Sequence, residues 1–385
     1  MAEAIFTTMP MFVCLFWASV LLLKFKEEDR AKKTLCIFML SATFLYFAHC
    51  AYFSREYEMI PLTDALYSFV NIAVYPLYYL YIKSLTSARP ISWKDFWVLL
   101  PAAVLGAASG CCYIGMSIVQ KECFVDNYMY GGSEAGMTGI LKAQAMIHDA
   151  IKIVFAAQII PVMFFGLRRI SSYNRLVMSY FSYTENKSLY QIKHLLIFFV
   201  LASISSFVIN AVGRAKFAGA IGILAIPSSL FSILLFAIGY IGMKIEFTAD
   251  ELAKISTCNP ESYPAEELGK REENDLKKKI IEVMEKKQLY LKPDLKISDL
   301  TQLMYTNRNY IYNAINVGMD ISFSEFVNRY RVKYAQGLML KSGETEISEI
   351  WAGAGFSSET SFYRNFKLYT GVTPQQWRSE HFSEK

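Results

Sequence analysis

The sequence predicts an all-α protein with two parts, a seven-transmembrane helix bundle followed by a cytoplasmic tandem helix-turn-helix domain. Two observations lead to this fold class. Charged residues make up about 13% of residues 1–243 but about 29% of residues 244–385, whereas a soluble domain carries about 25%. The first part contains long apolar runs, and the second contains short helical patterns separated by turn residues. A hydrophobic content of 54% also argues against a uniformly soluble or disordered chain.

Residues 1–243 contain seven stretches that approach the length of about 20 apolar residues needed to span a bilayer. In chain order they are Ala4–Leu23, Thr34–Tyr52, Leu62–Ile82, Phe96–Tyr113, Ala145–Phe165, Leu195–Val212 and Ala218–Met243. The fourth and the sixth are the shortest. We therefore expect residues 1–243 to form a seven-helix transmembrane sensor region.

Basic residues predict the orientation of this region. The first, third and fifth loops hold 13 Lys and Arg residues, and the second, fourth and sixth hold five. Because Lys and Arg are enriched in cytoplasmic loops, we expect the N-terminus outside and the C-terminal part in the cytoplasm. No basic segment precedes the first apolar run, so we expect no cleaved signal peptide.

Polar side chains at membrane depth are candidates for a ligand-sensing site. Tyr75 stands beside Pro76 in an aromatic-rich span, and His148, Asp149 and Lys152 lie at the outer end of another span. An interfacial aromatic belt also explains Tyr75, and a structural ion pair also explains Asp149 and Lys152. Both interpretations stay open, and the signal itself, a small molecule or a protein, is not identified.

The composition offers no sign of catalytic chemistry. The histidines are scattered and no cysteine spacing fits zinc, so no metal and no cofactor are expected. The chain has neither a P-loop nor a dinucleotide-binding glycine motif, and we expect it not to be an enzyme. Cys111, Cys112 and Cys123 fall on the expected outer side, where the sequence leaves a disulfide with Cys123 open.

Residues 244–290 are predicted to be a cytoplasmic linker. The two prolines of Thr257–Pro264 favour a loop. Glu266–Leu291 has the apolar spacing of an amphipathic helix. This helix either packs on the following domain or serves as a dimerisation or signal-relay helix.

Residues 291–385 predict two helix-turn-helix units joined by a central helix at about Ser322–Lys341. The predicted helix pairs are Lys296–Met304 with Arg308–Asn316, and Ile347–Ala354 with a helix that runs from Ser357 or Ser358 to Tyr369. Short helices with so tight a turn are typical of this motif, and two in tandem strengthen the assignment. Gly355 is expected at the second turn, and Gly318 and Gly371 are expected as left-handed helix ends.

The stretch from Glu346 to Arg378, EISEIWAGAGFSSETSFYRNFKLYTGVTPQQWR, resembles the DNA-binding module of the arabinose-regulator (AraC) family of transcription factors. The resemblance extends over about Leu291–Arg378. The residues in signature positions are Gly355, Phe356, Ser357, Phe362, Arg364, Phe366, Lys367, Gly371, Thr373, Pro374 and Arg378, with Arg331 and Ala335 in the central helix. Trp351 and Gly353 depart from the family pattern, which puts the helix angle of the second unit in doubt.

The resemblance implies a membrane-bound transcription regulator that binds promoter DNA, similar to AraC-type regulators in the inner membrane of Bacteroidetes-like bacteria. The second helix of each unit would enter the major groove. The DNA-binding residues expected on the outward faces are Arg308, Asn309, Tyr312, Asn313, Glu359, Thr360, Ser361, Arg364 and Lys367. Expected partners are double-stranded DNA, the lipid bilayer and a second copy of the chain on DNA, and contact with RNA polymerase stays open.

Charge limits how such a module would bind. Residues 289–385 carry 11 basic and 10 acidic residues, so affinity must come from placed side chains and from pairing of two copies. A signal is expected to pass through residues 244–290. The alternatives are a transporter with a regulatory appendage, or a module that has lost DNA binding and docks a partner protein.

Overall fold

The computed structural model describes residues 2–23, 25, 29–212, 221–257, 270–341 and 346–382. Within these ranges every regular element is a helix, apart from an isolated bridge between Phe181 and Lys296. The predicted all-α fold class is confirmed. By their contacts the residues form two compact units, Met1–Ser171 with Leu189–Asp250, and Ser172–Ser188 with Glu251–Lys385.

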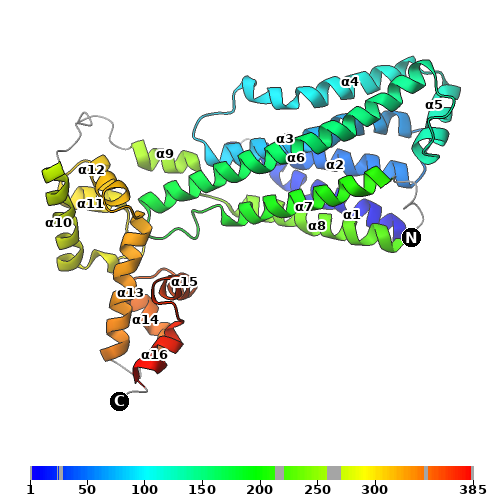
Figure 1. Ribbon diagram of the computed structural model, residues 1–385. Coiled ribbons are helices and arrows are strands. Elements are labelled where there is room, and N and C mark those ends of the chain that lie inside the picture. The colour runs from blue at the N-terminus through cyan, green and yellow to red at the C-terminus, as the bar shows by residue number, and fades with distance from the viewer. Residues whose placement is uncertain are drawn as a thin grey trace. The chain divides into compact units, whose positions relative to one another are not determined.

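The first unit is built mainly from long helices, with three shorter helical elements between them (Figure 1). They are α1 (Ala2–Leu23), α2 (Arg30–Phe53), α3 (Ile60–Thr86), η1 (Trp93–Leu99), α4 (Leu100–Gly115), α5 (Ile118–Phe124), η2 (Val125–Tyr130), α6 (Gly139–Tyr180), α7 (Tyr190–Val212) and α8 (Ile221–Lys244). Helix α6 continues beyond Ser171, so its last residues belong to the second unit.

Seven helices of the described ranges are long and apolar enough to cross a bilayer. The first four and the sixth begin and end within five residues of the predicted spans, whereas the fifth extends from Gly139 to Tyr180 and the seventh lies further along the chain than predicted, at Ala225–Ala253. Helix α1 packs against α2 and α8, α2 against α3, α3 against α4, and α7 against α8. This packing buries α3 most completely.

A proline shows how polar groups are satisfied in this unit. Pro10 lies inside α1 and has no N–H to donate to the carbonyl of Phe6, four residues earlier. The hydroxyl of Ser228 on α8 donates a hydrogen bond to that carbonyl instead. A side chain of a neighbouring helix therefore replaces the lost backbone bond, as bilayer helices with proline require.

The segment between α4 and α6 is folded against the bundle. The Tyr52 hydroxyl donates to the carbonyl of Met129 (2.8 Å), and the Tyr130 hydroxyl donates to the carbonyl of Tyr52 (2.6 Å). Cys111, Cys112 and Cys123 are free thiols in this structure.

The second unit consists of short helices. They are α9 (Ala249–Thr257), which begins in the first unit, α10 (Lys270–Lys287), η4 (Leu289–Leu291), α11 (Ile297–Met304), α12 (Arg308–Tyr312), η5 (Asn313–Val317), α13 (Phe323–Lys341), α14 (Ile347–Gly353), α15 (Glu359–Thr370) and α16 (Pro374–Phe382). The loop predicted at Thr257–Pro264 lies outside the described residues, apart from Thr257.

Two apolar cores hold this unit together. Ile280 and Met284 of α10 are fully buried in the core of the first helix pair, beside Ile297, Leu300 and Ile311. The second core gathers residues of α13, α14, α15 and α16, including Phe356, Phe362, Phe366 and Trp377. Helix α10 therefore packs on the domain that follows it, which is the first of the two interpretations that its sequence allowed.

Glycine positions match the predicted turns only in part. Gly355 (φ 79°) and Gly371 (φ 83°) are left-handed, and a Cβ on Gly355 would stand 2.6 Å from the Tyr290 carbonyl oxygen. The expected left-handed end at Gly318 is wrong, because its φ is −73°. The chain there widens into a π-helical turn, with Gly318 N–H donating to the Asn313 carbonyl (2.7 Å), and it reaches left-handed φ at Asp320 instead.

Candidate nucleic-acid interface

The second helix of the first pair, α12 with η5, is here named the first reading helix. Asn307 caps it, because its side chain accepts a hydrogen bond from the Asn309 N–H (2.9 Å). Ile311, Ala314 and Ile315 are fully buried and fix the inner face. Asn309 and Asn313 are exposed on the other face, as predicted.

Arg308 and Tyr312 of this helix are half-buried. Asparagine can pair with adenine and arginine with guanine through two hydrogen bonds each. The first reading helix thus presents residue types that recognise bases. Arg308 and Tyr312 also contact another part of the second unit, which is described below.

Helix α15 is here named the second reading helix. Its cap is Ser358, whose hydroxyl accepts from the Ser361 N–H (3.1 Å). Phe362 and Phe366 are fully buried and fix the inner face. The predicted residues that are exposed are Glu359, Thr360, Arg364 and Lys367.

The expected outward position of Ser361 is wrong. Its exposed fraction is 6%. The side chain of Asn365 donates to the Ser361 carbonyl (2.8 Å), and the capped first turn holds the residue against the interior. Ser361 therefore helps to shape the helix start, and its side chain does not lie on the outward face.

One buried arginine ties the loop between α6 and α7 into this unit. Arg331 of α13 is 1% exposed. Its guanidinium donates to the carbonyls of Tyr290 (2.7 Å) and Lys292 (2.7 Å) and to the Ser182 hydroxyl (3.2 Å). Burial lowers the pKa of Arg331 to about 10, and the charge of Asp294 opposes this shift, so the side chain stays charged at neutral pH.

Ser182 is held through its backbone as well. Its N–H donates to the carbonyl of Leu295 (3.0 Å), and its carbonyl accepts from the Ser324 hydroxyl (3.1 Å). We name Ser172–Ser188 the inserted segment, since the chain returns to the first unit at Leu189. The second unit is therefore completed by residues from a distant part of the sequence.

The inserted segment contacts the first reading helix. The ring of Tyr180 packs against that of Tyr312 (centroids 5.4 Å apart), and the Arg308 guanidinium lies over the Tyr180 ring (5.7 Å). The Asn316 amide donates to the Ser179 carbonyl (3.4 Å). Two predicted DNA-binding residues are thus engaged by Tyr180.

The inserted segment also contacts the second reading helix. The Glu185 carboxylate accepts a hydrogen bond from the Ser358 hydroxyl (2.6 Å) and lies 3.6 Å from the Arg364 guanidinium. Sequence reasoning did not single out Tyr180, Ser182 or Glu185. The one available signal was Glu185, an acidic residue in a loop that is otherwise rich in Lys and Arg.

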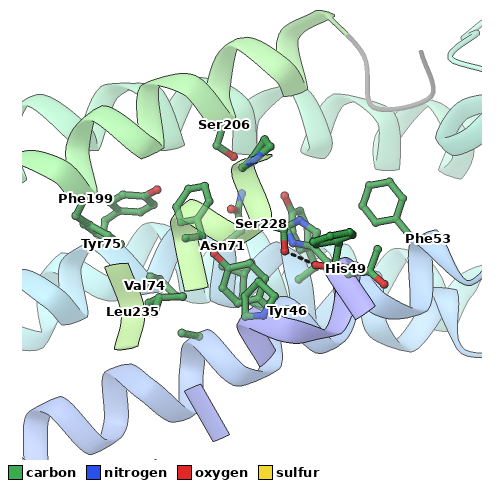
Figure 2. A pocket seen from close by; sticks show the side chains of 18 of the residues that line it. Tyr46, His49, Phe53, Asn71, Val74, Tyr75, Phe199, Ser206, Ser228 and Leu235 are labelled. Atoms are coloured by element: carbon green, nitrogen blue, oxygen red, sulfur yellow. Dashed lines mark hydrogen bonds between the residues drawn. The ribbon is translucent and has the colours of Figure 1, made fainter. Parts of the chain in front are cut away.

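The predicted sensing residues belong to the first unit, where Tyr75 and His148 line two different cavities. Tyr75 lines a cavity of about 150 Å³ inside the bundle, with its ring edge-on to Phe155 (5.0 Å) (Figure 2). His148 is 8% exposed, and its Nε2 lies 2.8 Å from Asp64, which also accepts a hydrogen bond from the Tyr113 hydroxyl (2.8 Å). His148 therefore joins three helices, α3, α4 and α6, through a buried carboxylate.

Asp149 and Lys152 form an ion pair (2.8 Å) whose side chains are about half exposed. Such exposed pairs contribute at most about 1 kcal/mol. Lys152 and His148 also line a small cavity of about 60 Å³, whose lining residues do not include Asp149. The structure thus places Tyr75, His148 and Lys152 at cavities and leaves Asp149 at the surface of the unit.

Comparisons with known proteins concern the C-terminal region. Residues 300–380 match a family model described as a helix-turn-helix domain. An uncharacterized HTH-type transcriptional regulator of Staphylococcus aureus (strain MSSA476) is 29% identical over 102 residues, 26% of this chain and 14% of that protein. The Msm operon regulatory protein of Streptococcus mutans is 30% identical over 86 residues, 22% of this chain and 31% of that protein.

The chain spans less than a third of the length of either relative, and no solved structure matches it. The matched region coincides with the two helix pairs and the helix that joins them. The C-terminal part of the chain therefore carries a helix-turn-helix domain of the AraC type, and through that domain it is related to transcription regulators.

Proposed function

We propose that the chain is a membrane-embedded transcription regulator whose seven-helix region controls promoter binding by the two reading helices. In this proposal the DNA-binding residues are Arg308, Asn309, Tyr312, Asn313, Glu359, Thr360, Arg364 and Lys367. The matched helix-turn-helix domain supports the DNA-binding part. Seven long apolar helices and the distribution of basic loop residues support the membrane part, with the N-terminus outside and the module in the cytoplasm.

The contacts of the inserted segment carry the regulatory part of this proposal. Arg308, Tyr312 and Arg364 are among the residues that we propose to contact DNA, and all three contact Tyr180 or Glu185. A duplex that uses these side chains must displace the inserted segment from them. The Glu185 carboxylate is negatively charged, as a DNA phosphate is, so it competes directly with DNA for Arg364.

The inserted segment also joins the fifth and the sixth apolar helix, α6 and α7. We therefore assign the relay between membrane and DNA to Ser172–Ser188 and not to residues 244–290. A signal would favour the bundle state in which Tyr180 and Glu185 leave the reading helices, and it must bind the two bundle states with different affinities. Pairing of two copies would add affinity for a double site.

The DNA-binding part is tested by substitution of both arginines. Arg308→Ala together with Arg364→Ala should abolish promoter occupancy of the full chain in a chromatin pull-down, at an unchanged level in the membrane. The matched control is Lys278→Ala on the exposed side of α10, which should keep occupancy. Full occupancy by the double variant would contradict DNA recognition by these helices.

The transporter alternative predicts a different result. Uptake of a labelled small molecule by cells that express the full chain, with no change in transcription, would favour it. The same cells provide both measurements, so one experiment separates the two functions.

A further inference from the structure

We propose that the cavity lined by Tyr75 binds a small neutral molecule made of one aromatic ring with a hydrogen-bonding group, of which phenol is the simplest example. This inference deepens the proposed function, since it names the class of signal that the bundle would detect. It rests on the size of the cavity, on its ring-rich lining and on two polar groups inside it.

The cavity lies among six helices of the first unit, α1, α2, α3, α6, α7 and α8 (Figure 2). Its volume of about 150 Å³ equals that of an engineered protein cavity that binds benzene. One six-membered ring is therefore the size of ligand that fits without rearrangement of the helices.

Aromatic side chains form a large part of the wall. They include Tyr46, Phe53, Tyr75, Phe155, Phe199 and Phe231. The Tyr75 ring is edge-on to Phe155 and tilted against Phe199, with both centroids 5.0 Å away. Aromatic rings prefer such edge and offset arrangements, so a planar ring ligand can continue the pattern.

Two polar groups in the cavity are without a partner in the described part of the chain. The Asn71 carboxamide and the Tyr46 hydroxyl line the cavity, and neither forms a hydrogen bond to a described residue. Ser228, by contrast, is occupied by the Phe6 carbonyl. The Asn71 side chain is partly exposed, and a ligand hydroxyl can both donate to its oxygen and accept from its nitrogen.

The lining also selects against charge. Among the described residues that line the cavity there is no Asp, Glu, Lys or Arg, and the one histidine, His49, carries no fixed charge. A carboxylate or an ammonium ligand would lose its hydration there without a fixed counter-ion. The cavity therefore favours phenol over benzoate, although the two rings have the same size.

The location explains how such a ligand could act. Phe155 belongs to α6 and Phe199 to α7, the two helices on either side of the inserted segment. A ring placed between these side chains changes the packing of both helices. The cavity thus offers a ligand contact with the two helices that lead into and out of the segment that we propose as the relay.

The test is thermal unfolding of the full chain in lipid nanodiscs with phenol, with toluene and with benzoate. Toluene has the shape of phenol without the hydrogen-bonding group. We compare the chain with Asn71→Leu, Val74→Phe, which fills the cavity, and the control Asn127→Leu outside it. Because each compound partitions equally into the lipid of every sample, differences between variants report the cavity.

Phenol should raise the unfolding temperature of the chain and of Asn127→Leu, and benzoate should not. Asn71→Leu should weaken phenol binding about tenfold and leave toluene binding unchanged, and Val74→Phe should abolish both. If Val74→Phe does not fold, Tyr46→Phe provides the second test, with a loss for phenol only. Equal phenol effects in the chain and Asn71→Leu, or equal effects of benzoate and phenol, would overturn the inference.

These measurements do not involve DNA. Phenol binding by a chain that binds no DNA would contradict the proposed function alone. A chain that occupies promoters but shows no phenol effect would contradict the ligand assignment alone.

Discussion

Replacement of Glu185 by glutamine should raise the affinity of the full chain for DNA. Glu185 lies 3.6 Å from Arg364, and it accepts a hydrogen bond from the Ser358 hydroxyl (2.6 Å). Glutamine keeps an oxygen that can accept from Ser358 but removes the negative charge that holds Arg364. DNA would then displace the inserted segment at a lower cost in free energy.

The size of the effect follows from the exposure of the pair. The Arg364 side chain is 53% exposed and that of Glu185 is 20% exposed. Exposed ion pairs are worth about 0.2–1 kcal/mol, and 1.4 kcal/mol corresponds to a factor of ten in affinity. We therefore expect DNA binding to tighten by a factor between about 1.4 and 5 at moderate salt, with a smaller gain at high salt because screening weakens the pair.

The assay is titration of a fluorescent duplex, selected by the full chain from a random-sequence library, against the chain in nanodiscs. Removal of any acidic residue near DNA lowers repulsion, so a matched control is needed. Glu349→Gln on α14 serves this purpose, since Glu349 is exposed on the same module. An affinity gain in Glu185→Gln that does not exceed the gain in Glu349→Gln would refute competition between Glu185 and DNA.

Four further outcomes are expected. Tyr180→Ala removes a ring contact and a cation–π contact, which are worth about 1–2 kcal/mol together. The affinity for DNA should therefore rise about five- to thirtyfold in the same titration. Tyr180→Phe keeps the ring and should leave the affinity unchanged. Ser358→Ala removes the cap of α15, worth about 1 kcal/mol, and amide hydrogen exchange in the first turn of α15 should accelerate about fivefold. Arg331→Met removes the donor from one buried and two partly buried carbonyls at a cost of about 3 kcal/mol. Limited proteolysis should detect this as loss of a resistant module, and an intact resistant module would contradict it. A periplasm-only reporter fused after Lys385 should stay inactive, and its activity would overturn the proposed topology.

The helices of both parts could be predicted from local patterns. Apolar runs of about 20 residues define the spans, and the spacing of residues such as Ile311 and Phe362 defines the inner faces of the reading helices. Gly355 was predictable because a tight turn between two short helices favours left-handed φ. These features depend on neighbours within a few residues in the sequence.

The inserted segment could not be predicted in this way. Arg331 matches a family position, but its partner Ser182 is 149 residues away, and no local pattern indicates so distant a pair. The outward position predicted for Ser361 was wrong because helical spacing alone places it on the outer face, whereas packing within the unit leaves it 6% exposed. A pocket was one of the two interpretations that the sequence allowed for Tyr75. The positions of Asn71 and Tyr46 beside it in the cavity depend on how six helices pack together.

In the membrane-embedded regulator that we propose, the interruption of the helix-turn-helix module has a consequence for proteolytic release. A single proteolytic cut between α9 and α10 would free residues 270–385 without Ser182, Glu185 or Tyr180. The freed fragment would lose the serine that binds Arg331 and also the acidic residue that occupies Arg364. Cleavage would thus produce a module that is less stable and whose Arg364 is no longer held by Glu185. Such a fragment would be short-lived, because its lifetime would be set by its own stability.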